Sequence, residues 1–142
     1  MEVSQAFAWV DATMRADSAL VAAATGGIWQ GFADIGVTAP YAQYSEQAGT
    51  DTITINAKRL FSRLLLQIKA IGPTGPTTSG YAALVVIANR IDALFGRVGS
   101  ITLSPGVMLS CYREQPLSYE ELINGAQWSH LGGLYHIDLQ GS

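Results

Sequence analysis

The segment from Leu60 to Phe95 constrains the fold more than any other part of the chain. It begins with residues 60–71, where the side chains alternate in the manner of a β-strand. One face carries Leu60, Leu64, Leu66, Ile68 and Ala70, and the other carries Phe61, Arg63, Leu65, Gln67, Lys69 and Ile71. Because successive side chains on a strand point to opposite faces, the pattern predicts a long strand with one buried and one semi-apolar face.

The glycine- and proline-rich run GPTGPTTSG, residues 72–80, follows this strand and predicts a loop. After it, helical spacing gives one apolar stripe made of Tyr81, Leu84, Val85, Ala88, Ile91 and Phe95. Ser79 is suited to cap this helix. A strand and the helix that follows it bury their apolar faces together. We therefore expect Leu64, Leu66 and Ile68 to pack against Leu84, Val85, Ile91 and Phe95.

The remaining sequence predicts one N-terminal helix and several further strands. The helix is expected over residues 4–24, and strands over residues 41–45, 107–112 and 134–140, with a short strand or irregular piece at 27–32. Residues 116–124, which contain SYEEL, suggest a single helical turn. Most connections are too short for a crossover helix, so the strands should be mostly antiparallel. The prediction is an α+β fold, a mostly antiparallel sheet flanked by two main helices, in one domain spanning residues 1–142.

Residues 46–58 form the segment that fits the core least well. Gln47, Gly49 and Asp51 suggest a loop, but the β-branched run that follows favours a hairpin arm. Unpaired strand edges are liabilities that proteins cover or use. We therefore expect an arm that is mobile in an isolated subunit and contacts a neighbouring molecule in an assembly. Its candidate interface residues are Thr52, Ile53, Thr54 and Ile55.

Composition restricts the classes of function. Charged residues make up 13% of the chain, against about 25% in an average protein, and there are 15 glycines. Such a surface suits burial by neighbouring subunits, or a compact glycine-rich monomer. The net charge is −3 with no basic run, which argues against direct nucleic-acid binding. Neither a signal peptide nor a membrane span is recognisable, so synthesis in the cytoplasm without membrane association is expected.

No set of residues predicts catalysis, a cofactor or a metal. The glycine pairs lack the spacing of a dinucleotide or phosphate loop. His136 and Asp138 share a strand face, but a metal site needs three or four ligands. Cys111 has no activating neighbour in the sequence and is expected to be a small buried apolar residue. Glu120 and Glu121 are adjacent and therefore face different ways. The sequence predicts a protein that is not an enzyme.

Several segments together resemble one known family. They are ADSALVAAATGGIW and APYAQY, the strand RLLLQIKA, the helix GYAALVVIANRIDALFG, then MLSCYREQP, YEEL and the ending WSHLGGLYHIDLQ. In order and length these resemble the tail terminator, or tail completion, proteins of long-tailed bacteriophages over residues 16–140. The chain differs from a typical member in its low lysine and arginine content and its long segment 46–58.

The resemblance implies a structural protein of the virion. Such proteins form a hexameric ring at the head-proximal end of the tail, where they end tail-tube polymerisation and present a head-joining surface. The implied partners are further copies of the chain, the tail tube protein and a head–tail connector or stopper protein, and DNA would pass through the lumen without specific binding. Two alternatives stay open, a head–tail connector of the same virion and a small intracellular binding module or enzyme subunit.

Overall fold

The computed structural model describes residues 2–34, 36–53, 55–56, 59–75, 78–103 and 106–140. Three helices and seven strands are formed within these ranges. In chain order they are α1 Glu2–Ala16, α2 Ser18–Ala23, β1 Ile28–Gln30, β2 Tyr41–Ile53, β3 Arg59–Pro73, α3 Thr78–Phe95, β4 Arg97–Val98, β5 Ile101–Thr102, β6 Val107–Ile123 and β7 Ala126–Gln140.

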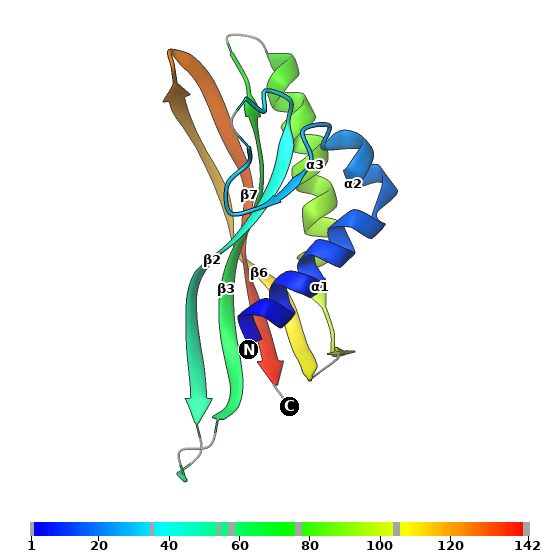
Figure 1. Cartoon of the computed structure of the whole chain (residues 1–142), viewed down its shortest axis with the longest axis vertical. Coiled ribbons are helices and arrows are strands. Elements are labelled where there is room, and N and C mark those ends of the chain that lie inside the picture. Colours follow the sequence, from blue (N-terminus) through cyan, green and yellow to red (C-terminus); the bar gives the residue numbers. More distant parts are fainter. Residues whose placement is uncertain are drawn as a thin grey trace.

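All of these strands belong to a single sheet with the order β1-β2-β3-β7-β6-β4, and β5 pairs with β6 beside β4. The β1–β2 pair is parallel, and the other pairs are antiparallel. The helices lie against one face of the strongly twisted sheet, and among the described residues no helix lies on the other face (Figure 1). This confirms the predicted α+β class with a mostly antiparallel sheet.

The strand–loop–helix unit is confirmed, with changes at its margins. β3 continues through Gly72 to Pro73, and α3 begins at Thr78, so the connecting loop is shorter than predicted. Ser79 lies inside the helix and not before it. The apolar stripe is rotated slightly, because Ile87 is fully buried while Tyr81 is 40% exposed.

The predicted N-terminal helix is divided into two. Asp17 adopts an extended conformation between α1 and α2, and its Oδ1 accepts a hydrogen bond from Leu20 N at 2.8 Å. An aspartate in this position satisfies a free N–H group at the start of a new helix. Arg90 of α3 pairs with the same carboxylate, and this hydrogen bond lowers the pKa of Asp17. The N-cap starts α2 at Asp17, and the salt bridge holds this start of α2 against α3.

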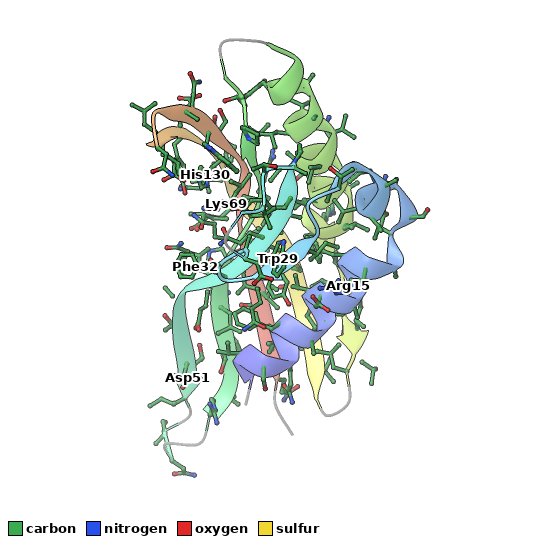
Figure 2. The ribbon with its side chains drawn as sticks, turned by 45° about the horizontal axis from the view of Figure 1, so that its top comes forward. Arg15, Trp29, Phe32, Asp51, Lys69 and His130 are labelled. Atoms are coloured by element: carbon green, nitrogen blue, oxygen red, sulfur yellow. The ribbon has the colours of Figure 1, made fainter. Side chains whose placement is uncertain are left out.

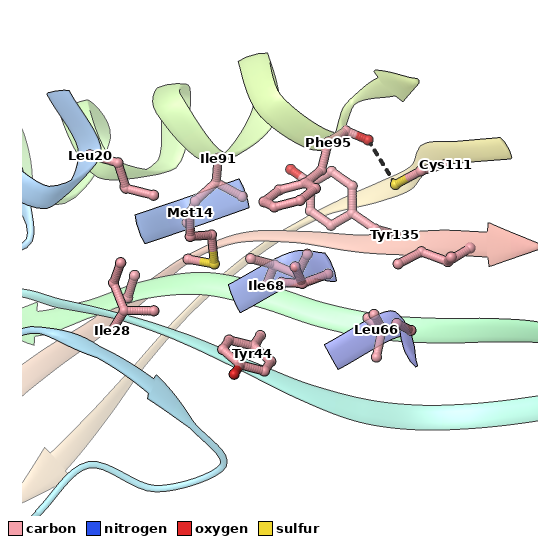
Figure 3. Close-up of a cluster of buried hydrophobic side chains, with 14 of the residues drawn as sticks. Met14, Leu20, Ile28, Tyr44, Leu66, Ile68, Ile91, Phe95, Cys111 and Tyr135 are labelled. Carbon is pink, nitrogen blue, oxygen red and sulfur yellow. Dashed lines mark hydrogen bonds between the residues drawn. The ribbon is translucent and has the colours of Figure 1, made fainter. Parts of the chain in front are cut away.

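The core lies between the helices and the covered face of the sheet (Figure 3). Its strand side is formed by the predicted face of β3 and by the inward residues of β7, and its helix side by α1, α2 and α3. The largest fully buried side chains are Met14, Leu20, Leu66, Ile68, Leu84, Ile87, Ile91, Phe95, Met108, Tyr135, Ile137 and Leu139. Leu64, Leu66 and Ile68 join Leu84, Ile91 and Phe95 in this cluster as predicted, whereas Val85 is only partly buried.

The structure corrects the sequence predictions for two segments. Residues 47, 49 and 51 are not a loop, because β2 continues through them to Ile53 and pairs with β3. Residues 116–123 are not a helical turn, because β6 continues to Ile123 and pairs with β7 along its whole length. Consequently the long β2–β3 hairpin extends past the helices at one end of the molecule, and the long β6–β7 hairpin lies at the opposite end, where α3 begins (Figure 1).

Candidate assembly surface

The hairpin β2–β3 carries the predicted interface residues at its tip. Thr52 and Ile53 are the last residues of β2, Ile55 lies in the turn, and Thr54 lies outside the described residues. Thr52 is exposed, and Ile53 and Ile55 are 61% and 104% exposed, so most of the apolar surface at this tip is open to solvent. Large exposed apolar groups of this kind mark contact surfaces when they gather in one place.

The backbone of this arm is held in register by polar contacts near the tip. Ser62 donates to the Asp51 carboxylate at 2.6 Å, and Arg59 lies 3.7 Å from the same group. The hairpin form that the sequence favoured is therefore confirmed. Mobility of the arm in an isolated subunit stays a prediction.

The hairpin β6–β7 forms a second exposed apolar tip, which was not predicted from the sequence. Leu122 and Ile123 are 77% and 40% exposed there. The turn is formed by Asn124 and Gly125, whose φ angles of 50° and 79° are both positive. Asn-Gly with two positive φ values is the signature of a type I′ hairpin turn. This dipeptide, set between the alternating residues of both strands, was the signal that could have identified the hairpin.

Between the tips, a polar network lies on the sheet face that no helix covers (Figure 2). Lys69 Nζ donates to the Tyr119 hydroxyl at 2.7 Å and lies 5.0 Å from the centre of its ring. The Tyr119 ring stacks on His130 with centroids 4.2 Å apart, and His130 Nε2 lies 2.6 Å from Glu121 Oε1. Burial lowers the pKa of both Lys69 and His130, against the attraction of Glu121, which raises both.

Gly132 makes this network possible. It is opposite Lys69 in the β3–β7 ladder, and a Cβ atom there would lie 2.3 Å from Ile68 O and 2.5 Å from Lys69 Cα. No side chain fits in that space, so β7 approaches β3 closely. The arrangement joins β3, β6 and β7 below the second tip.

His136 and Asp138 lie on the same open face but form separate pairs. Asp138 accepts two hydrogen bonds from Arg63, at 2.8 and 3.2 Å, and His136 Nε2 lies 3.1 Å from Glu114 Oε1. In the described ranges no group of three or more His, Cys, Asp or Glu side chains could hold a metal ion. Both pairs connect neighbouring strands and so help to hold the sheet together.

Cys111 and Glu121 each make a structural contact within the subunit. The Cys111 thiol is buried and donates to Phe95 O at 3.3 Å, and burial raises its pKa to about 12. A thiol of this kind is a poor nucleophile at neutral pH. Glu120 and Glu121 point to opposite faces of β6, and Glu121 is the partner of His130.

In the part of the chain that the structure describes, no helix has the length and apolarity to cross a membrane.

Comparisons with known proteins show a likeness at the level of the fold. No family model matches the sequence, and no curated protein matches it. Among solved structures, the fold is similar to a chain from the virion of a native gene transfer agent particle, with a TM-score of 0.69 and 14% sequence identity. The match covers 93% of this chain and 92% of the other. At this identity the likeness concerns the fold, and it extends over nearly the whole of both chains.

Proposed function

We propose that this protein is a structural component of a phage-like virion and acts by assembly, not by catalysis. The observation that carries the proposal is the shared fold with a chain of a gene transfer agent particle, which extends over both chains without a large additional segment in either. Exposed apolar tips on two long hairpins support it, because they are available for contacts with other subunits.

In its finer form, the proposal is a tail terminator. Six copies would form a ring on the head-proximal end of the tail, end polymerisation of the tail tube and present a surface to the head–tail connector. The sequence resemblance described above supports this position. A closed ring uses the same heterologous contact at each junction, so each subunit needs two different complementary surfaces. The two hairpin tips supply two such surfaces.

The net charge of −3 fits the passage of DNA through such a ring. Proteins grip DNA mainly by neutralising phosphates with lysine and arginine. This chain has eight lysine and arginine residues against eleven aspartate and glutamate residues. An acidic ring would not hold the DNA that passes through it.

The experiment is a mass measurement of the purified chain, followed by electron microscopy with tubes of the neighbouring tail-tube protein. The proposal predicts a discrete hexamer that binds one end of the tubes and stops their growth. A hexamer that ignores tubes but binds the portal-side connector would instead favour the head–tail connector. A stable monomer that purifies with a small molecule would favour the binding module and contradict the proposal.

A further inference from the structure

The edge of the sheet is open at two places. β2 pairs with β1 as far as Tyr44, but along 46–53 no described strand pairs with its outer side. β6 pairs with β4 and β5 as far as Tyr112, but along 115–123 its outer side likewise has no partner among the described strands. Such edges present unpaired N–H and C=O groups that can accept another strand.

The direction of the free backbone groups on β2 follows from its ladder. Ala42 N donates to Gly27 O at 3.0 Å, away from β3. Alternation along the strand, shifted by one residue at the bulge that precedes Ala48, directs the N–H groups of Gly49 and Asp51 to the open edge. Their side-chain positions are on the helix side of the sheet, since a Cβ atom at Gly49 would lie 3.1 Å from Leu64 Cδ2 of the core.

The same reasoning applies to β6. Arg113 N donates to Gly96 O at 3.2 Å, away from β7, and its guanidinium lies 3.5 Å from Asp92 of α3 on the helix side. Beyond the bulge that follows Arg113, alternation directs the N–H groups of Ser118 and Glu120 to the open edge, again from positions on the helix side. Both open edges therefore offer free backbone groups from residues that face the same way.

We propose that these two edges pair with each other between copies of this chain, with 46–53 of one copy antiparallel to 115–123 of the next. The inference rests on the proposed ring and specifies the contact that closes it. Directly opposed residues of an antiparallel pair point to the same side of a sheet. Because the outward residues of both edges are on the helix side, the joined sheets keep their helices on one side. Rotational symmetry requires this of every junction.

Strand direction and position agree with the same junction. β2 and β6 run in opposite directions within the subunit. A neighbouring copy related by rotation therefore places its β6 antiparallel to the β2 of the first copy. The two open segments lie at opposite ends of the sheet (Figure 1). Pairing them shifts each copy along the strands relative to the last, and a closed sheet needs such a stagger.

The side chains at the two edges support pairing over part of their length. Ile53 and Leu122, among the most exposed apolar side chains of the molecule, belong to these segments and would be covered. Pro116 is the next outward position before Ser118, so its missing N–H lies on the open edge and leaves the β6–β7 ladder intact. Pairing is thereby limited to the distal part of β6.

The first test removes single outward donors. Asp51→Pro and Ser118→Pro each take one N–H from an open edge, with Asp51→Ala and Ser118→Ala as controls for the lost side chains. We expect the proline variants to fold with the circular dichroism and melting temperature of their alanine controls. Their self-association, measured by analytical ultracentrifugation, should be roughly tenfold weaker, because every junction of the ring loses a hydrogen bond. Thr50→Pro, which removes an inward donor, should instead destabilise the hairpin.

The second test crosslinks the junction. Asp51→Cys is combined in turn with Ser118→Cys, Glu120→Cys and Leu122→Cys, and oxidised samples are separated under denaturing, non-reducing conditions. Opposed residues of an antiparallel pair have Cα atoms close enough for a disulfide. All variants keep the buried Cys111. One of the three combinations should give covalent oligomers, and the variants with only one introduced cysteine should give at most dimers.

The outcomes separate this inference from the proposed function. Rings that form equally well with the proline variants, and that give no covalent oligomers, overturn edge pairing and leave the tail role standing. Crosslinked open filaments without closed rings support edge pairing and contradict the terminator. A wild-type chain that stays monomeric at high concentration overturns both.

Discussion

Lys69 is a buried cation on the sheet face that no helix covers, with 4% of its surface exposed. It is held there by the Tyr119 hydroxyl and ring, and Tyr119 is in turn stacked on His130. A buried charge is tolerated when it is hydrogen-bonded and has an opposite charge nearby, which Glu121 provides. The network therefore fixes the distal part of the β6–β7 hairpin against β3.

The lowered pKa of His130 predicts a dependence of stability on pH. Burial lowers the folded-state pKa, so the unfolded chain binds the proton first as the pH falls. The free energy of unfolding should decrease from about pH 7.5 to about pH 5.5, near the ordinary range of histidine. His130→Gln should show a smaller decrease in urea titrations at several pH values. The groups that face His130 are Lys69, Tyr119 and Glu121, and an unchanged slope in the variant would contradict the assignment.

Gly132 gives a second prediction at the residue scale. A Cβ atom there would meet the backbone of β3, which cannot move aside as a flexible side chain would. Gly132→Ala should therefore reduce the free energy of unfolding by at least 1–3 kcal/mol, the approximate cost of overpacking. Gly99→Ala is the matched control, because a Cβ atom at Gly99 meets nothing within 4 Å. Equal melting curves for the two variants would show that β7 can relax.

At the scale of elements, β3 and α3 form the centre of the core. Leu66→Ala and Leu84→Ala should each cost about 2–5 kcal/mol, since both side chains are fully buried. Leu60→Ala, at a position that is 47% exposed, should cost much less and serves as the control. Chemical denaturation measures all three. A cost below about 0.5 kcal/mol for Leu66→Ala would place the core elsewhere.

The sequence predicts β3 and α3 well because each has a strong hydrophobic period. A glycine- and proline-rich run also marks the boundary between them. The two-residue period of β3 identifies its buried face, and the three-to-four-residue period of α3 identifies most of its stripe. The fine rotation that buries Ile87 instead of Tyr81 depends on how the helix lies on the sheet. Such docking is set by tertiary packing, which local periodicity does not contain.

The hairpins and the helix break were harder to predict, because long-range pairing determines them. SYEEL has residues that suit a helix, yet β7 offers a full ladder to β6, and pairing overrides weak propensity. The local sequence does not distinguish Asp17 from other helix residues. Its role depends on Arg90, a residue distant in the sequence that binds its carboxylate. The second exposed tip was missed for the same reason as β6, although Asn124-Gly125 was available as a turn signal.

At the scale of the whole molecule, the helices cover one face of the sheet and the tips of the two hairpins lie at opposite ends (Figure 1). Exposed apolar side chains are found at both tips, and also on the outer side of α3 at Val86, which is 53% exposed. A heterologous ring contact needs two different surfaces on one subunit, at separate places. The separation of the tips meets this need, while the helix surface is free for other contacts.

The final prediction distinguishes the tips from the helix surface. Ile53→Asp combined with Ile55→Asp adds charge where the proposed ring contact would exclude water, which disfavours assembly. Because both positions are exposed, the free energy of unfolding of the subunit should change by no more than about 0.5 kcal/mol. We expect the double variant to fold, to stay monomeric by light scattering and to leave tail tubes uncapped. Val86→Asp, at a similarly exposed position on α3, should assemble normally. Normal rings from the double variant, or loss of rings from Val86→Asp alone, would move the assembly surface from the hairpin to the helices.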